Sequence, residues 1–180
     1  MMQMNFSEAA AITFSRVSAP PPPLINTPHW SGLLGNATRP ASELRSALDF
    51  GLKSEPYHLN HDLVDIGWTQ AGLDGIFLEK LIREEKASWW RGGQGLLVEW
   101  DDDDEEGNKI LGLSLAACAP ESMPEFLMDA RRRAAAGGYA SVFGIFYIGP
   151  QIESALTQAG YSSHWDSAAY IYERRHPQRS

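Results

Sequence analysis

Apolar and polar positions follow two different periods along the chain, and the second half shows the change of period most clearly. Apolar runs typical of strands occur at 95–100, 109–118, 141–148 and 168–174. Between them, apolar spacings of three and four residues predict helices that begin at Pro124 and Pro150 and end before glycines. Strands that alternate with helices in this way indicate an α/β fold with a mixed sheet.

The first half of the chain is less regular. A short alternating run from residue 12 predicts a strand, and Pro20–Pro23 then requires an extended backbone. Helical spacing predicts one helix over 41–50, ended by Gly51, and a long one over 71–90. The segment 54–68 suits a loop with a turn or a short helix. We therefore expect an N-terminal strand and proline-rich segment at 1–28, followed by one domain at 29–176.

Charge and composition exclude several classes of function. The net charge of −8 disfavours nucleic acid as a partner. No apolar run approaches the roughly 20 residues that cross a bilayer, so we expect no membrane contact. A single cysteine permits no internal disulfide, and the N-terminus lacks a basic leader pattern, which together favour a cytoplasmic location. The arginines at 131–133 are expected to lie on a solvated helix face.

The acidic run 101–106 is interpreted as a solvated hairpin turn, tightened by Gly107 and Asn108. Its acids are consecutive, whereas a calcium loop spaces its ligands at alternate positions. One cysteine and five scattered histidines make no zinc pattern. The sequence therefore predicts no metal site.

The order of predicted elements is similar to that of the GNAT acyltransferases. The likeness is carried by "ITFSRVSAP" from Ile12, "SWWRGGQGLLVEW…NKILGLSLAA" from Ser88, and "LMDARRRAAAGGYASVFGIFYI" from Leu127. It continues through "IESALTQAGY" from Ile152, with its Ala-Gly-aromatic ending, and "AAYIYERR" from Ala168. The resemblance implies a GNAT-like mixed central sheet flanked by helices in a single domain. It also implies an acyl-CoA held in a V-shaped gap between two central strands, with acyl transfer to an amine.

One motif of that family is missing. Its members hold the pyrophosphate of the cofactor with a loop of the form Gln/Arg-x-x-Gly-x-Gly/Ala between a strand and a helix N-terminus. Here no glycine occurs between Ala119 and Glu125, and Ser122 with Glu125 predicts a capping box instead. Pro124 removes an amide donor, and Glu121 and Glu125 add negative charge.

Two other interpretations of the missing loop remain open. A different alignment of this junction would delete a strand as well as the loop. The glycine-rich segment 91–95 resembles a displaced phosphate loop, but it follows a predicted helix and precedes a strand, which is the opposite context. Acetyl-CoA or another acyl-CoA is therefore expected to bind weakly, and no other cofactor is expected.

Candidate site residues follow partly from the resemblance and partly from side-chain chemistry. The resemblance implies that a pantetheine arm would pair with the strand edge at Leu115, Ala116, Ala117 and Cys118. His58 and His61 are the acid/base candidates, because a helix would place Asp62 and Asp65 one turn beyond them. The family's tyrosine that protonates the thiolate is replaced by Leu156. By residue type alone, the substitutes are Tyr147, Tyr139, Tyr161 and Ser114.

The function expected from these features is acyl-CoA-dependent N-acyltransferase (N-acetyltransferase) activity on a small amine. One alternative is a GNAT-like scaffold that has lost CoA binding and runs a lyase, cyclase or isomerase step through His58 or His61. Another is a non-catalytic protein that binds a partner. The expected ligand is a small molecule, and the sequence leaves a homodimer open.

Overall fold

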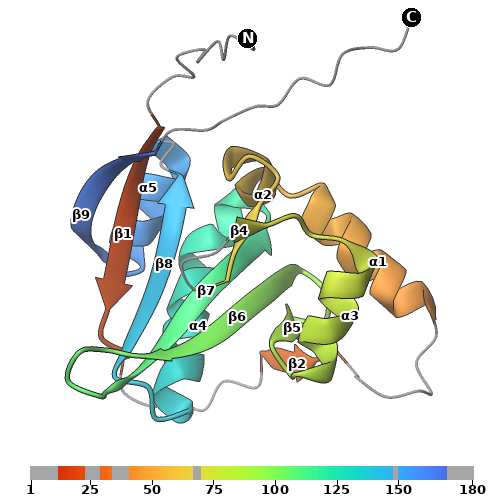
Figure 1. Ribbon diagram of the computed structural model, residues 1–180, viewed down its shortest axis with the longest axis horizontal. Helices are drawn as coiled ribbons and strands as arrows, with labels where there is room; N and C mark the ends of the chain where they lie inside the picture. The colour runs from red at the N-terminus through yellow and green to blue at the C-terminus, as the bar shows by residue number, and fades with distance from the viewer. Residues whose placement is uncertain (1–11, 23–28, 34–40, 67–69, 148–149, 170–180) are drawn as a thin grey trace, which may run out of the picture.

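A seven-stranded mixed sheet forms the centre of a single domain in the computed structural model, which describes residues 12–22, 29–33, 41–66, 70–147 and 150–169 (Figure 1). In spatial order its strands are β2 (Trp30–Gly32), β5 (Ala87–Trp90), β6 (Gly95–Asp103), β7 (Lys109–Cys118), β8 (Ser141–Tyr147), β1 (Ile12–Ala19) and β9 (Ser162–Ala169). Two short strands, β3 (Val64–Asp65) and β4 (Gln70–Ala71), form a separate ladder.

Helices cover both faces of this sheet, so the predicted α/β class is confirmed. One buried cluster joins Leu96 and Val98 of β6 to the helices α1 (Ala41–Leu52), α2 (Glu55–Leu59) and α3 (Gly75–Arg83). The other joins Leu97 of β6 to α4 (Met123–Ala136) and α5 (Pro150–Gln158). Neighbouring residues of one strand thus point into different cores, as the pleat of a strand requires.

A parallel unit lies at the centre of the sheet. β7 and β8 are neighbours and parallel, paired from Ile110↔Ser141 to Leu113↔Gly144, with α4 as their connection. The predicted hairpin of β6 and β7 is also present. Its acidic turn closes around Asp104, which accepts hydrogen bonds from the amides of Glu106 and Asn108 and from the Asn108 side chain, and these bonds lower its pKa.

A β-bulge interrupts the hairpin at Ser114. Val98 pairs with Leu115 but the next residue, Glu99, pairs with Leu113, so β7 has one extra residue there. As a result Leu113 belongs to the core under α4 and α5, whereas Leu115 belongs to the core under α1 to α3. In a regular strand these two side chains would share a face.

β1 lies inside the sheet, between β8 and β9. It is antiparallel to both, and its pairs run from Phe14↔Tyr147 to Ala19↔Val142 on one side and from Ile12↔Ala169 to Ser18↔Ser162 on the other. The N-terminal strand is therefore an integral part of the domain's sheet. β9 begins at Ser162, before the predicted strand at 168–174, of which residues 170–174 lie outside the described ranges.

The long helix predicted over 71–90 is wrong. α3 begins after Asp74, whose side chain accepts from the Phe77 amide at 2.7 Å, and it ends at Arg83. Glu85 then takes a left-handed φ of 59°, and 87–90 forms β5. The apolar pattern continues past the end of α3 because Trp90 of β5 is fully buried, in the core under α4 and α5.

The predicted helix at 41–50 is present, but Gly51 does not end it. α1 continues to Leu52, and Gly51 is buried against the sheet. A Cβ atom at this position would lie 2.7 Å from Cδ2 of Leu73 and 3.2 Å from Cδ2 of Leu96. The glycine therefore serves the close approach of α1 to the sheet.

Gly112 of β7 allows another close approach, which predicts a large effect on stability. A Cβ atom there would overlap the indole ring of Trp100, which packs edge-on against Phe143 with centroids 6.1 Å apart. We expect Gly112→Ala to lower the free energy of unfolding by about 2–3 kcal/mol, measured by urea denaturation, because Trp100 must move within a packed core.

The matched control for Gly112→Ala is Gly32→Ala. Gly32 also lies in a strand, but a Cβ atom there would meet nothing within 4 Å. This control should change stability by less than about 0.5 kcal/mol. Equal effects of the two substitutions would contradict the assigned packing of Trp100.

Candidate active site

The two central parallel strands separate toward their C-terminal ends. The ladder between β7 and β8 stops at Leu113↔Gly144 within the described residues. On their outer sides both strands continue to pair, β7 with β6 as far as Cys118 and β8 with β1 as far as Tyr147. The inner edges beyond Leu113 and Gly144 therefore present backbone N–H and C=O groups that lack a ladder partner. The sheet has a gap at its centre.

A shallow pocket that opens to solvent lies in this gap. Its walls come from α2 and the residue after it, from the separating halves of β7 and β8, and from α5. The lining residues are Pro56, Leu59, Asn60, Leu113, Ser114, Leu115, Ala116, Ile145, Phe146 and Ile152. The lining thus combines residues from α2, on one face of the sheet, with Ile152 of α5, on the other.

Two polar side chains in this lining have unused hydrogen-bonding capacity. Asn60 is 8% exposed, and its Nδ2 donates to the Leu63 carbonyl at 2.6 Å, which leaves Oδ1 without a partner among the described residues. Ser114 is 6% exposed, and its Oγ likewise has no partner there. Leaving such a group unpaired costs about 1–3 kcal/mol. Both atoms are buried, so a ligand could bond to them only after the side chains that cover them move aside.

Local backbone geometry explains why these two side chains reach the pocket. Asn60 ends α2, with its own amide bonded back to the helix, and the next two residues take left-handed φ angles of 54° and 59°. Ser114 is the extra residue of the bulge, and bulges re-aim side chains at many active sites. In the sequence, Ser114 is a candidate by residue type only, and Asn60 carries no local signal of a functional role.

The predicted acid/base histidines lie outside the pocket lining. The His58 side chain is 59% exposed on α2, and its Nδ1 lies 2.8 Å from Oδ1 of Asp62. His61 is exposed in the turn after the helix, and Asp65 is buried in β3. The left-handed residues 61 and 62 end the helical face on which the expected second pair depended. A catalytic role for either histidine stays a prediction.

Of the four β7 residues predicted to bind a pantetheine arm, two line the pocket and two do not. Leu115 and Ala116 line the pocket, whereas Ala117 packs in the core under α1 to α3. Cys118 is buried with its Sγ 3.8 Å from Sδ of Met123, and burial raises the pKa of its thiol to about 12. The thiol therefore stays protonated near neutral pH and is a poor nucleophile.

None of the tyrosines proposed as proton donors is among the described residues that line the pocket. Tyr147 is the last residue of β8, and its side chain lies outside the described part of the structure. Tyr161 is buried and donates to the Leu127 carbonyl at 3.3 Å; burial raises its pKa. Tyr139 donates to Asp101, and burial with this bond raises its pKa to about 12. Neither Tyr139 nor Tyr161 lines the pocket.

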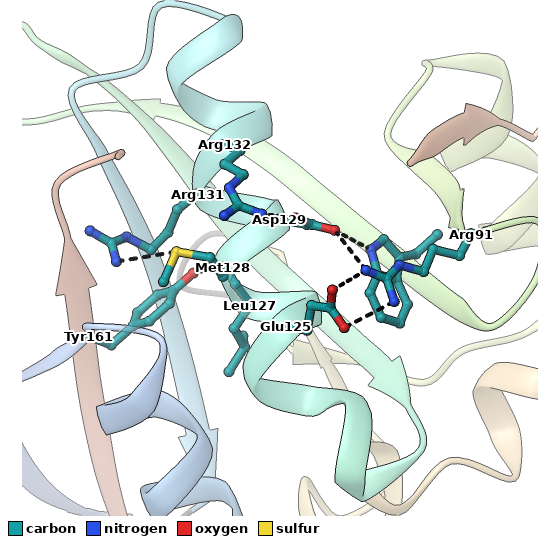
Figure 2. A network of polar contacts seen from close by, with 9 residues as sticks. Arg91, Glu125, Leu127, Met128, Asp129, Arg131, Arg132 and Tyr161 are labelled. Atoms are coloured by element: carbon teal, nitrogen blue, oxygen red, sulfur yellow. Dashed lines mark hydrogen bonds and ion pairs between the residues drawn. The ribbon is translucent and has the colours of Figure 1, made fainter. Parts of the chain in front are cut away.

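The predicted capping box between Ser122 and Glu125 is wrong. A 3₁₀ turn at Pro120–Ser122 precedes α4, and it holds Ser122 at φ −93° and ψ −10°, outside the extended region that a capping side chain needs. Ser122 makes no side-chain cap hydrogen bond. Glu125 turns away from the helix end and binds the guanidinium of Arg91 through both carboxylate oxygens (Figure 2).

The same turn offers an anion few amide donors. Pro120 and Pro124 have no N–H, and the amides of Ser122 and Met123 donate to the carbonyls of Ala119 and Pro120. A phosphate site at a helix N-terminus requires several free N–H groups that converge on the ligand. This junction therefore does not fit a pyrophosphate.

The glycine-rich turn at 91–95 does not supply the missing donors. It lies beside the junction, since Gly95 pairs with Cys118. However, the amide of Arg91 donates to His29, and those of Gly93 and Gln94 donate to Trp90. These N–H groups are already bonded within the protein, so the turn is not a displaced phosphate loop.

A buried carboxylate fixes this turn to α4. Asp129 is fully buried and accepts from Nε1 of Trp90 at 2.9 Å and from Nη1 of Arg132 at 2.7 Å (Figure 2). Nη2 of Arg91 lies 4.0 Å from it, and the Arg91 guanidinium stacks over the Trp90 ring at 4.4 Å. The network thus ties the end of β5 to the first half of α4.

The predicted solvated face of arginines is instead used for contacts inside the protein. Arg131 donates to the carbonyls of Pro20 and Ala159, and Arg133 binds Glu99 through two hydrogen bonds. Arg132 belongs to the Asp129 network. All three guanidinium groups have partners within the chain, which does not favour a nucleic-acid surface.

Comparison with known proteins adds no family assignment: no protein-family model and no curated protein matches the chain. Within the described ranges, no helix is long and apolar enough to span a bilayer. The same residues hold no group of three or more histidine, cysteine or acidic side chains placed to bind a metal ion.

Proposed function

We propose that the protein is a GNAT-like acyltransferase that moves an acyl group from a thioester to a small amine. The observation that carries this proposal is the separation of β7 and β8 after Leu113 and Gly144, with a pocket between them. Unpaired strand edges suit a slender donor arm that contains amide groups. A pocket beside these edges could hold the acceptor next to the thioester, which supplies proximity.

The pocket residues support the chemical step as well. The amine nitrogen attacks the thioester carbonyl, the C–S bond breaks, and the departing thiolate takes up a proton. The Ser114 hydroxyl, buried and without a partner, could donate a hydrogen bond to the developing negative charge. The surrounding aliphatic side chains would keep water from the thioester.

The donor is proposed to bind through its acyl-pantetheine end. The unpaired inner edges of β7 and β8 could bond to the amides of a pantetheine arm, whereas the turn before α4 lacks the donors for a pyrophosphate. Acyl-CoA would then be a donor of low affinity, recognised mainly by the part that carries the thioester.

A comparison of two donors tests this proposal. Acetyl-CoA and acetyl-pantetheine are each incubated with the protein and a panel of small amines, and N-acetylated product is measured by mass spectrometry. We expect kcat/KM values for the two donors within about threefold, because the nucleotide makes few contacts that are specific to the transition state. Absence of product with both donors would refute acyl transfer. A preference of about 100-fold for acetyl-CoA would refute recognition through the pantetheine end alone.

No structural observation favours the two alternative functions. The histidines on which a lyase, cyclase or isomerase step would depend are exposed and outside the pocket lining. Among the described residues one large apolar side chain, Ile76, is strongly exposed, and a single exposed residue does not define a partner surface.

A further inference from the structure

The lining of the central pocket contains no ionisable side chain among the described residues. Eight of its ten members are apolar, and the other two are Asn60 and Ser114. His58 of α2 contacts Asp62 in the turn after that helix, and both side chains are exposed to solvent and outside the lining. This absence restricts the charge state of any amine that enters the pocket.

An alkylamine is poorly suited to such a pocket. An alkylamine is an ammonium ion at neutral pH, like a lysine side chain, whose pKa is about 10.4. Burying an ammonium without a carboxylate partner is strongly unfavourable, and the ion must also lose a proton before its nitrogen can attack. The described lining provides neither the counter-charge nor a base.

An uncharged amine matches the polar and apolar groups of the pocket better than an ammonium ion does. The Nδ2–Leu63 bond fixes the orientation of the Asn60 amide, so Oδ1 can only accept a hydrogen bond. An N–H of the amine can donate to it, and the Ser114 Oγ can pair with a second polar atom. The apolar wall, which includes Leu59, Ile145 and Phe146, suits a flat hydrocarbon ring.

We propose that the acceptor substrate is an arylamine, or another amine that is uncharged at neutral pH, held by Asn60 and Ser114. This inference rests on the proposed acyl transfer and names its substrate class. The neutral nitrogen attacks the thioester carbonyl, a C–N bond forms and the C–S bond breaks. The proton that the nitrogen then sheds neutralises the thiolate, so no external base is consumed.

Two isomeric amines provide the test. The compound 4-methylaniline is an arylamine and uncharged near pH 7, whereas benzylamine has the same atoms but is an ammonium ion. With acetyl-pantetheine as donor, we expect kcat/KM for 4-methylaniline to exceed that for benzylamine by at least about tenfold. The kcat/KM for 4-methylaniline should stay constant as the pH rises, whereas the kcat/KM for benzylamine should increase. Equal or better use of benzylamine at neutral pH would overturn the inference and leave the transferase proposal intact.

Three variants connect the preference to the pocket. Ser114→Ala should weaken binding of 4-methylaniline by about 3–10-fold, measured by NMR titration without a donor. Ser88→Ala is the matched control, because Ser88 is also buried with an unpartnered Oγ but lies in β5, outside the pocket lining. Asn60→Asp adds a carboxylate at the same place and should shift the ratio of the two kcat/KM values toward benzylamine. Equal effects of the two serine variants, or an unchanged ratio in Asn60→Asp, would contradict the assignment.

The binding measurement separates the two proposals. If neither isomer is acetylated but 4-methylaniline binds in a manner that depends on Ser114, acyl transfer is refuted and the preference of the pocket is supported. If 4-methylaniline does not bind to the wild-type protein at millimolar concentration, the inference fails whatever the donor experiment shows.

Discussion

Asp129→Ala is expected to lower the free energy of unfolding by about 3–5 kcal/mol in urea denaturation. The carboxylate is fully buried, and its two oxygens accept from Nε1 of Trp90 and Nη1 of Arg132. Removal would leave the indole N–H unpaired in the core and two guanidinium groups, those of Arg91 and Arg132, without their shared anion. A partly buried charge that loses its partner keeps its desolvation cost.

Glu125→Ala is the matched control for Asp129→Ala. Glu125 lies four residues earlier on the same helix and binds the same arginine, but its side chain is 55% exposed. Its replacement should cost less than about 1 kcal/mol, as is usual for surface ion pairs. If the two substitutions cost the same, the stability of this junction would not depend on the buried carboxylate.

Millimolar acetyl-CoA is expected to raise the melting temperature of the protein by about 1 °C or less. A site with micromolar affinity would be stabilised by more than about 2.7 kcal/mol under these conditions, equivalent to a shift of about 5–10 °C for a chain of this size. The difference arises because each charge-assisted bond to a pyrophosphate contributes about 1.5–3 kcal/mol, and the turn before α4 lacks the donors to make them.

Weak CoA binding is expected for two reasons, repulsion by acidic side chains and a lack of amide donors, and the acidic side chains prove less important. The sequence suggested that Glu121 and Glu125 would repel the pyrophosphate. Arg91 binds Glu125, which reduces that repulsion. The lack of amide donors in the turn before α4 is therefore the main reason to expect weak binding of acetyl-CoA. Isothermal calorimetry provides the direct measurement, and a dissociation constant of a few micromolar would contradict it.

Local signals predicted the second half of the fold well. The hairpin of β6 and β7 and the helix α4 follow from apolar period and turn residues, whereas these local signals do not fix the parallel pairing of β7 with β8. The error at 71–90 arose because Trp89 and Trp90 extend an apolar pattern whose period changes at Glu85. A single left-handed residue that is not glycine leaves no clear trace in the sequence.

The candidate site was harder to predict, because it depends on contacts between distant segments. Whether Ser114 is a bulge depends on how β7 aligns with β6, and the residue itself carries no such information. The open Oδ1 of Asn60 depends on a bond to Leu63 and on α2 packing over the gap. The capping box failed for a similar reason, since Glu125 binds Arg91, from the turn between β5 and β6, and not the helix end.

The place of β1 in the sheet has a consequence for how the protein is made. Phe14 pairs with Tyr147, so β1 leaves the ribosome before β8 and waits for a partner about 130 residues further along the chain. Such distant pairing is slow, and until it forms, one edge of β8 is exposed to other chains. Since β8 is one wall of the central gap, the pocket would be among the last features to form during synthesis.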